Sequence, residues 1–427
     1  MEQNNSAQEH LTVNPKDITE SLNHVNSLLA QCLAILNSLG PTLSQTLHDD
    51  QHLPKMEEVH LAARATDTLH KIQLLLDPPA LILADHFLGY VRSKCLSAAV
   101  QHGVSDALEK GPMALSDLAK STHSRSDRLR QILGILCNRG VFTYDDVSGR
   151  YSNSAASSLI ASKHWTQWHN WVTLYGNQFY DIARGIPASV DQDASRTAAQ
   201  LNYNTNEDMF TFFRTQEWAP QLHRTLGSGA VAQLPGILED YPWHELSSRL
   251  VMDIGGGGGD FIAGLLRRHP TMQGGLFDQP HIADTFREAV SLGGKFHALA
   301  RQIRTHHIVG GDFFKSVPRC SDYTMKWCLH DWKDSEAVVI LKNIRKSLVP
   351  EPGSRLVVLE SVLSDRHSGR LAQYGDINMM MTIGGQERTE NDWRRLARLS
   401  GWHVHGIWDL RRAWVKALDF RPLEAEF

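Results

Sequence analysis

The sequence predicts an α/β protein with a parallel, Rossmann-like sheet in its C-terminal half and mainly helical regions before it. Two observations support this prediction. Residues 250–267 consist of an apolar strand, five consecutive glycines and a helical segment, which is how a nucleotide-binding βαβ unit begins. From about residue 245 onward, apolar strand-like runs alternate with helical segments, as they do in doubly wound sheets.

The glycine turn runs from Gly255 to Gly259. Glycine permits positive φ values and, because it lacks a Cβ, lets a ligand lie against bare backbone. Gly255 and Gly257 are therefore candidate ligand contacts, although such a run can also be only a tight turn. Asp278 favours a ligand site, because it ends the next apolar strand roughly 20 residues on, where a carboxylate can accept hydrogen bonds from ribose hydroxyls. Its alternative role is to cap the helix that begins near Pro280.

Three further apolar runs also end in polar side chains. Asp312 and Phe313 follow the third run, and an acid beside an aromatic ring could hold an adenine. The fourth run leads into His330 and Asp331, and the fifth ends in Glu360. Because open α/β sheets bind ligands at the carboxyl ends of their strands, these side chains are expected to meet in one crevice.

Composition narrows the class of protein. The chain has 427 residues, enough for two or three domains, and its net charge of −4 gives no basic field for nucleic acid or an acidic membrane. It contains no apolar run of about 18 residues or more, and the polar N-terminus does not resemble a signal sequence. The five cysteines are scattered singly, and the 22 histidines show no metal-ligand spacing. A cytoplasmic protein without a metal site is therefore expected.

The first 76 residues are expected to form a helical arm. Apolar residues recur at helical spacing over 17–48, with an end near Gly40, and a second helix is expected over 55–76. The apolar face of such an arm must pack on another surface. A partner subunit and the chain's own domain are equally good candidates for that surface.

Residues 77–160 are expected to form a small domain of the winged-helix type. An apolar helix over 80–103 is followed by short helices, an amphipathic helix that starts at Ser126, and two short strands that could form the wing. The same pattern occurs in DNA-binding proteins, so DNA binding is one hypothesis. The arginines near the Ser126 helix belong to no wider basic patch, which argues against it.

Residues 161–427 are expected to form the remaining domain, in which a helical, aromatic-rich segment over 163–243 precedes the sheet. Most of these aromatic side chains should serve ordinary packing. Their excess just before the glycine turn also suits the wall of a pocket for a flat apolar ligand, and Trp171 and Phe179 are the candidates. Two final strands within residues 402–418 are close enough in sequence to pair as an antiparallel hairpin.

Six segments resemble the S-adenosylmethionine-dependent O-methyltransferases of the metal-independent caffeate and flavonoid type, and the fungal branch that methylates small metabolites is the most similar. They fall in order over residues 250–393: VMDIGGGGGD, LFDQP, VGGDFF, MKWCLHDWKD, VVLESVL and GGQERTENDW. The resemblance implies a class I methyltransferase domain with a seven-stranded sheet and an antiparallel last hairpin. It also implies that the winged-helix domain dimerises rather than binding DNA, so a homodimer is expected. The arm lies outside the family pattern.

The resemblance implies roles for individual residues. His330, in the His-Asp-Trp motif, is the expected catalytic base, and Glu360 and Glu387 are its expected supporting carboxylates. S-adenosylmethionine is the expected cofactor and S-adenosylhomocysteine the expected product. Gln386 departs from the family, which usually has lysine at this position. The expected cofactor contacts are Gly255, Gly257, Asp278, Asp312, Phe313 and Lys326.

A histidine suits the chemistry that the resemblance implies. A sulfonium methyl is already activated, so the protein must position an acceptor and remove its proton. A phenol is mostly protonated at neutral pH, and a histidine with an unperturbed pKa of about 6.5 can take its proton. Such a base needs a partner on its other ring nitrogen, which Glu360, Glu387 or both could supply. His330 could instead be a surface residue that caps the next helix.

The acceptor side has three further candidates. Asp331 could contact the substrate or cap the next helix. Met379 and Met380 precede the loop that carries Glu387, and methionine adapts to irregular apolar ligands. Core packing is the expectation for Met381.

The expected reaction is methyl transfer to a phenolic or enolic hydroxyl of a small aromatic or polyketide-like metabolite. The alternative is a non-methylating relative that keeps S-adenosylmethionine for its positive charge and catalyses a cyclisation or pericyclic rearrangement. The presence of His330, Glu360 and Glu387 together argues against it.

Overall fold

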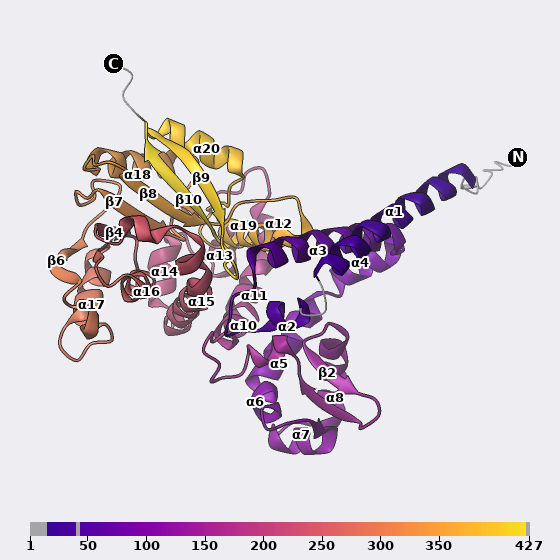
Figure 1. The fold of residues 1–427 in the computed structure, drawn as a ribbon. Coiled ribbons are helices and arrows are strands. Elements are labelled where there is room, and N and C mark those ends of the chain that lie inside the picture. Colours follow the sequence, from indigo (N-terminus) through magenta and orange to yellow (C-terminus); the bar gives the residue numbers. More distant parts are fainter. Residues whose placement is uncertain (1–14, 40–42, 424–427) are drawn as a thin grey trace, which may run out of the picture. The chain divides into compact units, whose positions relative to one another are not determined.

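The structure is a computed structural model that describes residues 15–39 and 43–423 (Figure 1). It divides into two units. The first comprises the described residues up to Phe87 together with residues 366–368, and the second comprises residues 88–365 and the remainder from Gly369. No helix in the described ranges is both long enough and apolar enough to cross a bilayer.

The first unit contains the region predicted as an arm over residues 1–76, but it extends to Phe87 and so includes α4 (Pro79–Phe87), which was assigned to the winged-helix domain. Its other helices are α1 (Pro15–Leu39), α2 (Leu43–His48) and α3 (Met56–Leu76). The first predicted helix, with its end near Gly40, is confirmed as α1, and the helix predicted over 55–76 is confirmed as α3; the short helix α2 was not predicted. Cys32 and Ile35 of α1 pack against Leu61 and Ala65 of α3, which ties the two long helices together. Residues 366–368 belong to this unit, because the Asp67 carboxylate accepts hydrogen bonds from the Ser368 amide and hydroxyl at 2.7 and 3.1 Å.

The second unit begins with the predicted winged-helix domain. The single helix predicted over 80–103 is wrong, because α4 and α5 are separated at Leu88 and Gly89, and glycine is a poor former of helix interiors. The amphipathic helix predicted from Ser126 is confirmed as α8, and the wing as β2 and β3, which pair antiparallel. The elements are α5 (Tyr90–Gln101), α6 (Val104–Leu108), β1 (Met113–Ala114), α7 (Leu115–Ser121), α8 (Ser126–Asn138), β2 (Phe142–Asp145), β3 (Arg150–Asn153) and α9 (Ala155–Ser158).

A helical segment connects this domain to the sheet, as predicted from its aromatic-rich sequence. Its longest helix, α15, contains Pro235 and ends shortly before the first strand of the sheet. The elements are α10 (His169–Tyr175), α11 (Gln178–Ile182), η1 (Ala183–Gly185), α12 (Ile186–Ser189), α13 (Ala198–Asn202), α14 (Met209–Thr215), α15 (Ala219–Asp240) and η2 (Trp243–Leu246).

The sheet has seven strands in the order β6-β5-β4-β7-β8-β10-β9. The pairings from β6 to β8 are parallel, while β10 is antiparallel to both β8 and β9, so the predicted seven-stranded sheet with an antiparallel last hairpin is confirmed. Figure 1 shows this hairpin in yellow. The strands are β4 (Leu250–Ile254), β5 (Gln273–Asp278), β6 (Ile303–Gly310), β7 (Asp322–Lys326), β8 (Arg355–Glu360), β9 (Trp402–Asp409) and β10 (Lys416–Pro422).

Both faces of the sheet are buried. Along β4, Val251 packs into one apolar cluster, whereas Met252 and Ile254 pack into another, because successive side chains point to opposite faces. Strands covered on both faces read as nearly continuous apolar runs. The helices that accompany these strands are α16 (Asp260–Arg268), α17 (Pro280–Val290), η3 (His297–Leu299), η4 (Leu329–Asp331), α18 (Asp334–Ser347), α19 (Arg370–Thr382) and α20 (Glu390–Leu399). The short helix η5 (His367–Gly369) lies mostly in the segment that belongs to the first unit.

Candidate active site

The glycine turn connects β4 to α16 with left-handed backbone at alternate positions. The φ angles of Gly255, Gly257 and Gly259 are 68°, 54° and 77°, values that glycine adopts without strain. A Cβ placed on Gly257 would have no atom within 4 Å, so open space lies beside the turn. The predicted contacts Gly255 and Gly257 therefore present bare backbone, and one of them borders a space that a ligand could fill.

Asp278 ends β5 and binds the glycine turn directly. Its Oδ2 accepts a hydrogen bond from the Gly257 amide at 2.9 Å, and its Oδ1 accepts from the Gln279 amide at 2.7 Å. Burial raises the pKa of Asp278, although these amides and nearby His281 oppose the shift. The alternative role as a helix cap is wrong, because Gln279 occupies the N-cap position of α17.

Asp312 and Phe313 follow β6 at the same edge of the sheet, since the Gly311 amide donates to the Asp278 carbonyl at 2.9 Å. The Phe313 ring lies edge-on to Trp332, with 5.9 Å between the ring centroids. Asn343 fixes this segment by donating to the carbonyl of Phe313 at 2.9 Å. Asp312 is exposed. Trp332 lies in the MKWCLHDWKD segment, but no role was predicted for it from the sequence.

Lys326 lies at the end of β7, and its Nζ is 4.2 Å from the centroid of the Trp327 ring. Burial lowers the pKa of Lys326 to about 8, although the carboxylates of Asp253 and Glu360 oppose the shift. Asp253 is itself buried and accepts a hydrogen bond from the Thr324 hydroxyl at 2.8 Å. The predicted Lys326 is thus a largely enclosed amine whose charge two nearby acids support.

His330 is buried, with 8% of its surface exposed, so the alternative of a surface cap is wrong. Its Nδ1 lies 2.9 Å from Glu387 Oε1 and 3.5 Å from Glu360 Oε2, and its Nε2 lies 3.5 Å from Asp331 Oδ1. A carboxylate can only accept, so Nδ1 donates to Glu387. The three predicted catalytic residues and Asp331 therefore form one cluster.

The pKa of His330 differs from the ordinary histidine value that was assumed from the sequence. Burial disfavours the imidazolium, but the carboxylates of Glu360, Asp331 and Glu387 outweigh burial and raise the pKa of His330 to about 10. Burial also raises the pKa of Asp331 to about 7, although His330 opposes that shift. The three acids therefore favour the protonated form of His330.

Glu360 supports the turn that carries the histidine. Its Oε1 accepts hydrogen bonds from the amides of Cys328 and Leu329, both at 2.8 Å. In the same turn Trp327 has a φ of 49°, a rare conformation for a bulky residue, and its amide donates to the Leu359 carbonyl at 3.1 Å. Glu360 thus fixes backbone as well as facing the imidazole.

The loop after α19 is attached to the histidine turn at several points. The Gln386 amide donates to the His330 carbonyl at 2.8 Å, and the Glu387 amide donates to Asp376 Oδ1 at 2.8 Å. Buried Arg388 donates to the carbonyls of Leu329 and Trp332. Asp376 and Arg388 were not predicted as site residues, although Arg388 lies within the GGQERTENDW segment.

Gln386, the departure from the family pattern, has a local role in this chain. Its side-chain nitrogen Nε2 donates a hydrogen bond to Asp334 Oδ1 at 2.8 Å. The same oxygen accepts a hydrogen bond from Arg388 Nε at 2.9 Å. A neutral amide therefore shares this acid with an arginine. The departure leaves the contact between His330 and Glu387 intact.

Trp171 belongs to a cluster of four tryptophans. Its ring lies edge-on to Trp414 at 4.9 Å and 6.1 Å from Trp327, and Trp168 stacks on Trp414 at 5.0 Å. The Trp414 carbonyl accepts from the hydroxyl of Ser361, the residue after Glu360, at 3.3 Å. Trp171 is thus connected to the turn before His330, while Trp327 and Trp414 were not predicted as site residues.

The remaining acceptor-side candidates separate into two groups. Phe179 and Met381 are buried in one apolar cluster with Leu174 and Ile182, which is the packing role expected for Met381. Met379 and Met380 are half-buried on α19. Asp331 does not cap α18, whose N-cap is Lys333, and its carboxylate faces His330 instead.

His330, Glu360 and Glu387 each place one possible metal-ligand atom within 4.8 Å of the others. In this geometry the Nδ1 of His330 is already hydrogen-bonded to Glu387, and Glu360 Oε1 holds two backbone amides. The contacts among the three residues are those of a hydrogen-bonded histidine with its supporting acids.

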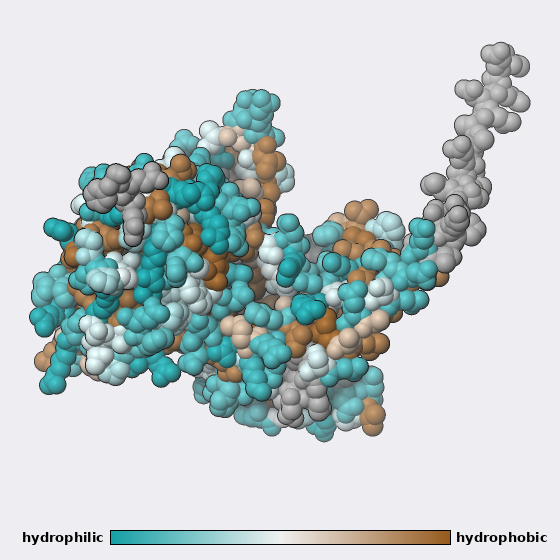
Figure 2. Space-filling view, turned by 45° about the horizontal axis from the view of Figure 1, so that its top comes forward, coloured by the Kyte–Doolittle hydropathy of each residue, from teal (hydrophilic) through white to brown (hydrophobic). Residues whose placement is uncertain are grey.

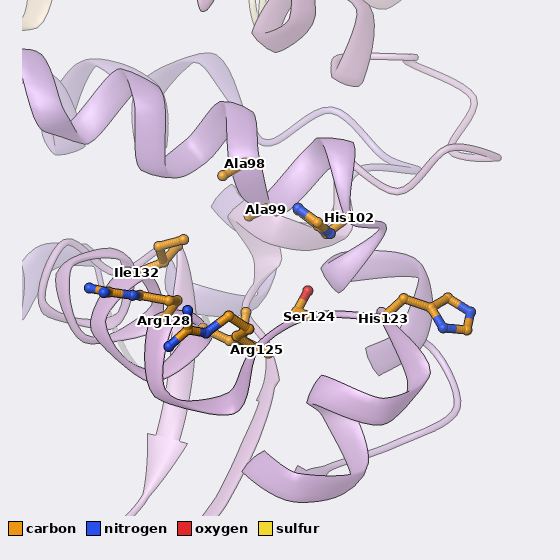
Figure 3. Close-up of a pocket in the computed structure, with 9 residues that line it drawn as sticks. Ala98, Ala99, His102, His123, Ser124, Arg125, Arg128 and Ile132 are labelled. Carbon is orange, nitrogen blue, oxygen red and sulfur yellow. The ribbon is translucent and has the colours of Figure 1, made fainter.

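A cavity of about 300 Å³ lies in the winged-helix domain between α5 and α8 (Figure 3). It contains none of the predicted site residues. Arg125 and Arg128 at this cavity are paired with Asp127, at 2.8 and 3.7 Å, so their charges are partly neutralised. The lining consists of Ala98, Ala99, His102, His123, Ser124, Arg125, Arg128, Leu129 and Ile132.

Comparison with known proteins identifies the family. Residues 165–403 match the family model of the O-methyltransferase domain, and residues 84–163 match that of the O-methyltransferase dimerisation domain. Because the first match alone spans more than half of the chain, the chain belongs to the O-methyltransferase family. It is an S-adenosylmethionine-dependent O-methyltransferase.

Two fungal relatives illustrate this similarity. The chain is 54% identical over 391 residues to O-methyltransferase aclM of Aspergillus oryzae, covering 90% of each protein. It is 43% identical over 386 residues to O-methyltransferase gliM of Aspergillus fumigatus, covering 89% of this chain and 88% of the relative.

Two solved structures share the fold. The methyltransferase CalO1 of calicheamicin biosynthesis, with S-adenosylhomocysteine bound, aligns with a TM-score of 0.70 and 23% identity, covering 80% of this chain and 98% of its own. Human N-acetylserotonin methyltransferase, in complex with S-adenosylmethionine, aligns with a TM-score of 0.68 and 23% identity, covering 82% and 99%.

Proposed function

We propose that the enzyme methylates a phenolic or enolic hydroxyl of a small, flat metabolite, with His330 as the general base. The observation that carries this proposal is the arrangement around His330. Its Nδ1 is occupied by Glu387, with Glu360 also close, so Nε2 is the nitrogen that can exchange a proton with an acceptor. A base held in one orientation by a carboxylate is the usual arrangement for this role.

The glycine edge of the sheet fits the cofactor. When bound, S-adenosylmethionine supplies a methyl group on a positively charged sulfur. Gly255 and Gly257 would offer bare backbone, and the open space beside Gly257 leaves room for a ligand. Asp278 would accept hydrogen bonds from ribose hydroxyls. Phe313, Trp332 and Asp312 would receive the adenine, and Lys326 would supply a charged group to the same crevice.

The pKa of His330 suits a phenolic proton once the base is neutral. A phenol has a pKa of about 10, so proton transfer to a histidine with a pKa of about 10 is nearly balanced in free energy. Glu360, Asp331 and Glu387 stabilise the imidazolium that results. Because His330 must first lose its own proton, the proposal includes a rate that rises above neutral pH.

The acceptor is proposed to lie against the tryptophan cluster of Trp168, Trp171, Trp327 and Trp414. Trp327 is three residues before His330, and Trp171 and Trp414 lie close to it. The buried Nε1 of Trp171 has no hydrogen-bond partner within the described part of the chain, so it could donate to an acceptor oxygen. A solved relative, NcsB1, is in complex with 2-hydroxy-5-methyl naphthoic acid, a flat aromatic compound.

Other parts of the acceptor site rest on weaker support. Half-buried Met379 and Met380 are proposed to line the pocket, and Asp331 to contact the acceptor beside His330. Phe179 is buried, and its ring lies 4.8 Å from the ring of Tyr175. It is therefore proposed to pack behind Tyr175 rather than to contact the acceptor. A homodimer formed through residues 84–163 completes the proposal, and the dimerisation-domain match supports it.

The experiment is mass spectrometry on purified enzyme supplied with S-adenosylmethionine and a panel of planar phenols, non-planar phenols and aromatic amines. We expect a planar phenol to gain about 14 mass units with an equal amount of S-adenosylhomocysteine. Methylation of the amines alone would contradict the proposed acceptor atom. A rearranged product of unchanged mass without S-adenosylhomocysteine would favour the non-methylating alternative.

A further inference from the structure

The arm carries a second apolar stripe that its own helices leave uncovered. On α1 four leucines recur at intervals of seven, four and three residues, which places them within about 60° of one another at about 100° per residue. Between 41% and 59% of each is exposed. The side chains of α1 that are buried lie on a stripe about 100° away. The exposed leucines are Leu22, Leu29, Leu33 and Leu36, and the buried residues are Leu28, Cys32 and Ile35.

The neighbouring helices add to this exposed surface. α4 has no buried residue, and Leu81, Leu83 and Phe87 on it are each more than half exposed. Leu69 and Leu76 of α3 are exposed as well. Figure 2 shows brown, apolar atoms exposed among the teal ones on this face of the molecule. Apolar exposure on this scale usually marks an interface.

We propose that the leucine face of the arm, formed by Leu22, Leu29, Leu33 and Leu36 of α1, binds the arm of a second copy of this chain. This proposal rests on the homodimer proposed above and extends its interface. The last residues of α4, from Ala84, already lie within the dimerisation-domain match, so the arm is continuous in sequence with that domain.

The arm is shared in part by a fungal relative. Residues 84–427 are 344 of the 427 residues, about 81% of the chain. The solved CalO1 fold covers 80% of this chain while using 98% of its own, a share similar in size to the chain without its arm. The Aspergillus oryzae relative covers 90%, and it therefore shares part of the arm.

The charge of α1 favours pairing between identical surfaces. Residues 21–39 include no aspartate, glutamate, lysine or arginine. A second copy therefore meets no like-charge repulsion on this helix. An anionic membrane surface would be met by basic residues on the polar face of the helix, and this stretch has none.

The test compares two triple variants of the full-length enzyme. Leu29→Glu, Leu33→Glu and Leu36→Glu together place charge on the leucine face. Asn23→Glu, Ala30→Glu and Asn37→Glu place the same charge on neighbouring turns of the exposed face, on the side of the leucine stripe away from the buried stripe. Neither variant alters a buried side chain of α1, and circular dichroism with S-adenosylmethionine titration would check the fold of both.

Sedimentation velocity over a range of concentrations gives the dimer dissociation constant. We expect the leucine-face variant to raise it at least about a hundredfold, because burying apolar surface is the main driving force of such pairing, while the control stays within about threefold. A dimeric leucine-face variant with the wild-type constant would overturn the arm proposal and leave the homodimer standing. A monomeric wild-type enzyme would overturn both.

Hydrogen exchange of the unmodified enzyme gives a second, independent readout. We expect the α1 amides between residues 22 and 36 to exchange more slowly as the protein concentration rises through the dissociation constant. Strong protection that is independent of concentration would mean that the chain's own domain covers the arm, and this would overturn the proposal. Protection that appears only with added phosphatidylcholine vesicles would identify a lipid surface instead and would also overturn it.

Discussion

The sheet edge that carries His330, where catalysis is proposed, and the N-terminal arm differ in how their side chains are covered. At the edge, the two glutamates around His330 are buried: Glu360 is fully buried and accepts hydrogen bonds from two backbone amides beside His330. On the arm, apolar groups are exposed, and 59% of Leu33 is accessible to solvent. A buried charge must find its partner within the fold, whereas an exposed leucine stripe gains free energy only from another surface.

The largest effect is expected from His330→Ala at the sheet edge. Loss of the proposed base should lower kcat by about 10²–10⁴-fold, while the affinity for S-adenosylmethionine changes little. Turnover by coupled detection of S-adenosylhomocysteine and binding by calorimetry would separate the two quantities. His405→Ala, an exposed histidine of β9, is the matched control. An H330A enzyme with the turnover of this control would remove His330 from the mechanism.

The next effect tests whether the glycine side of the same edge holds the cofactor. Asp278→Ala removes a carboxylate that could bond two ribose hydroxyls, so the Kd for S-adenosylmethionine should rise about 10–100-fold. kcat at saturating cofactor should change far less. Asp284→Ala removes an exposed acid from α17, where it pairs with Arg287, and should leave the Kd unchanged. Equal Kd values for the two variants would show that Asp278 does not bind the cofactor.

A smaller effect, of about tenfold in kcat, is expected from Glu387→Gln, and its pH dependence is the sharper readout. The carboxylates raise the pKa of His330 to about 10, so kcat/KM should rise with pH as the imidazolium loses its proton. Removing one carboxylate weakens the stabilisation of the imidazolium. The pKa of His330 should therefore fall, and the rising limb should move to lower pH.

Glu390→Gln is the control for this shift. Glu390 is exposed, lies three residues after Glu387 and pairs with Arg394. Its limb should coincide with that of the unmodified enzyme. A limb that stays in place in E387Q would show that a group other than His330 titrates, such as the acceptor hydroxyl itself.

The same comparison explains what the sequence could predict. Gly255, Asp278, Glu360 and His330 could be predicted as site residues because they stand in short motifs at strand ends, and parallel strands bring those ends together. Asp376 and Arg388 hold the Glu387 loop through contacts that no motif encodes, so they were missed. The raised pKa of His330 depends on three acids meeting in space, which residue spacing alone does not give.

Packing outside the motifs was predicted less well. Trp414 joins Trp171 from the far end of the chain, after the last motif, so only the fold reveals their contact. The helix over 80–103 was predicted as continuous because its apolar composition masked the break at Gly89. On the arm, periodicity predicted the helices, but it could not show which of two apolar stripes on α1 was already covered.

The smallest effect concerns heat stability, and it separates the two regions most directly. If the arm pairs with a second copy, the Tm of the unmodified enzyme should rise by about 2 °C or less for each tenfold increase in protein concentration, because association stabilises the folded state by mass action. The leucine-face variant should lose most of this dependence, while H330A should keep it. Differential scanning calorimetry over a hundredfold range of concentration would measure it. If H330A lost the dependence as well, association would depend on the sheet edge, and the two regions could not be treated as separate surfaces.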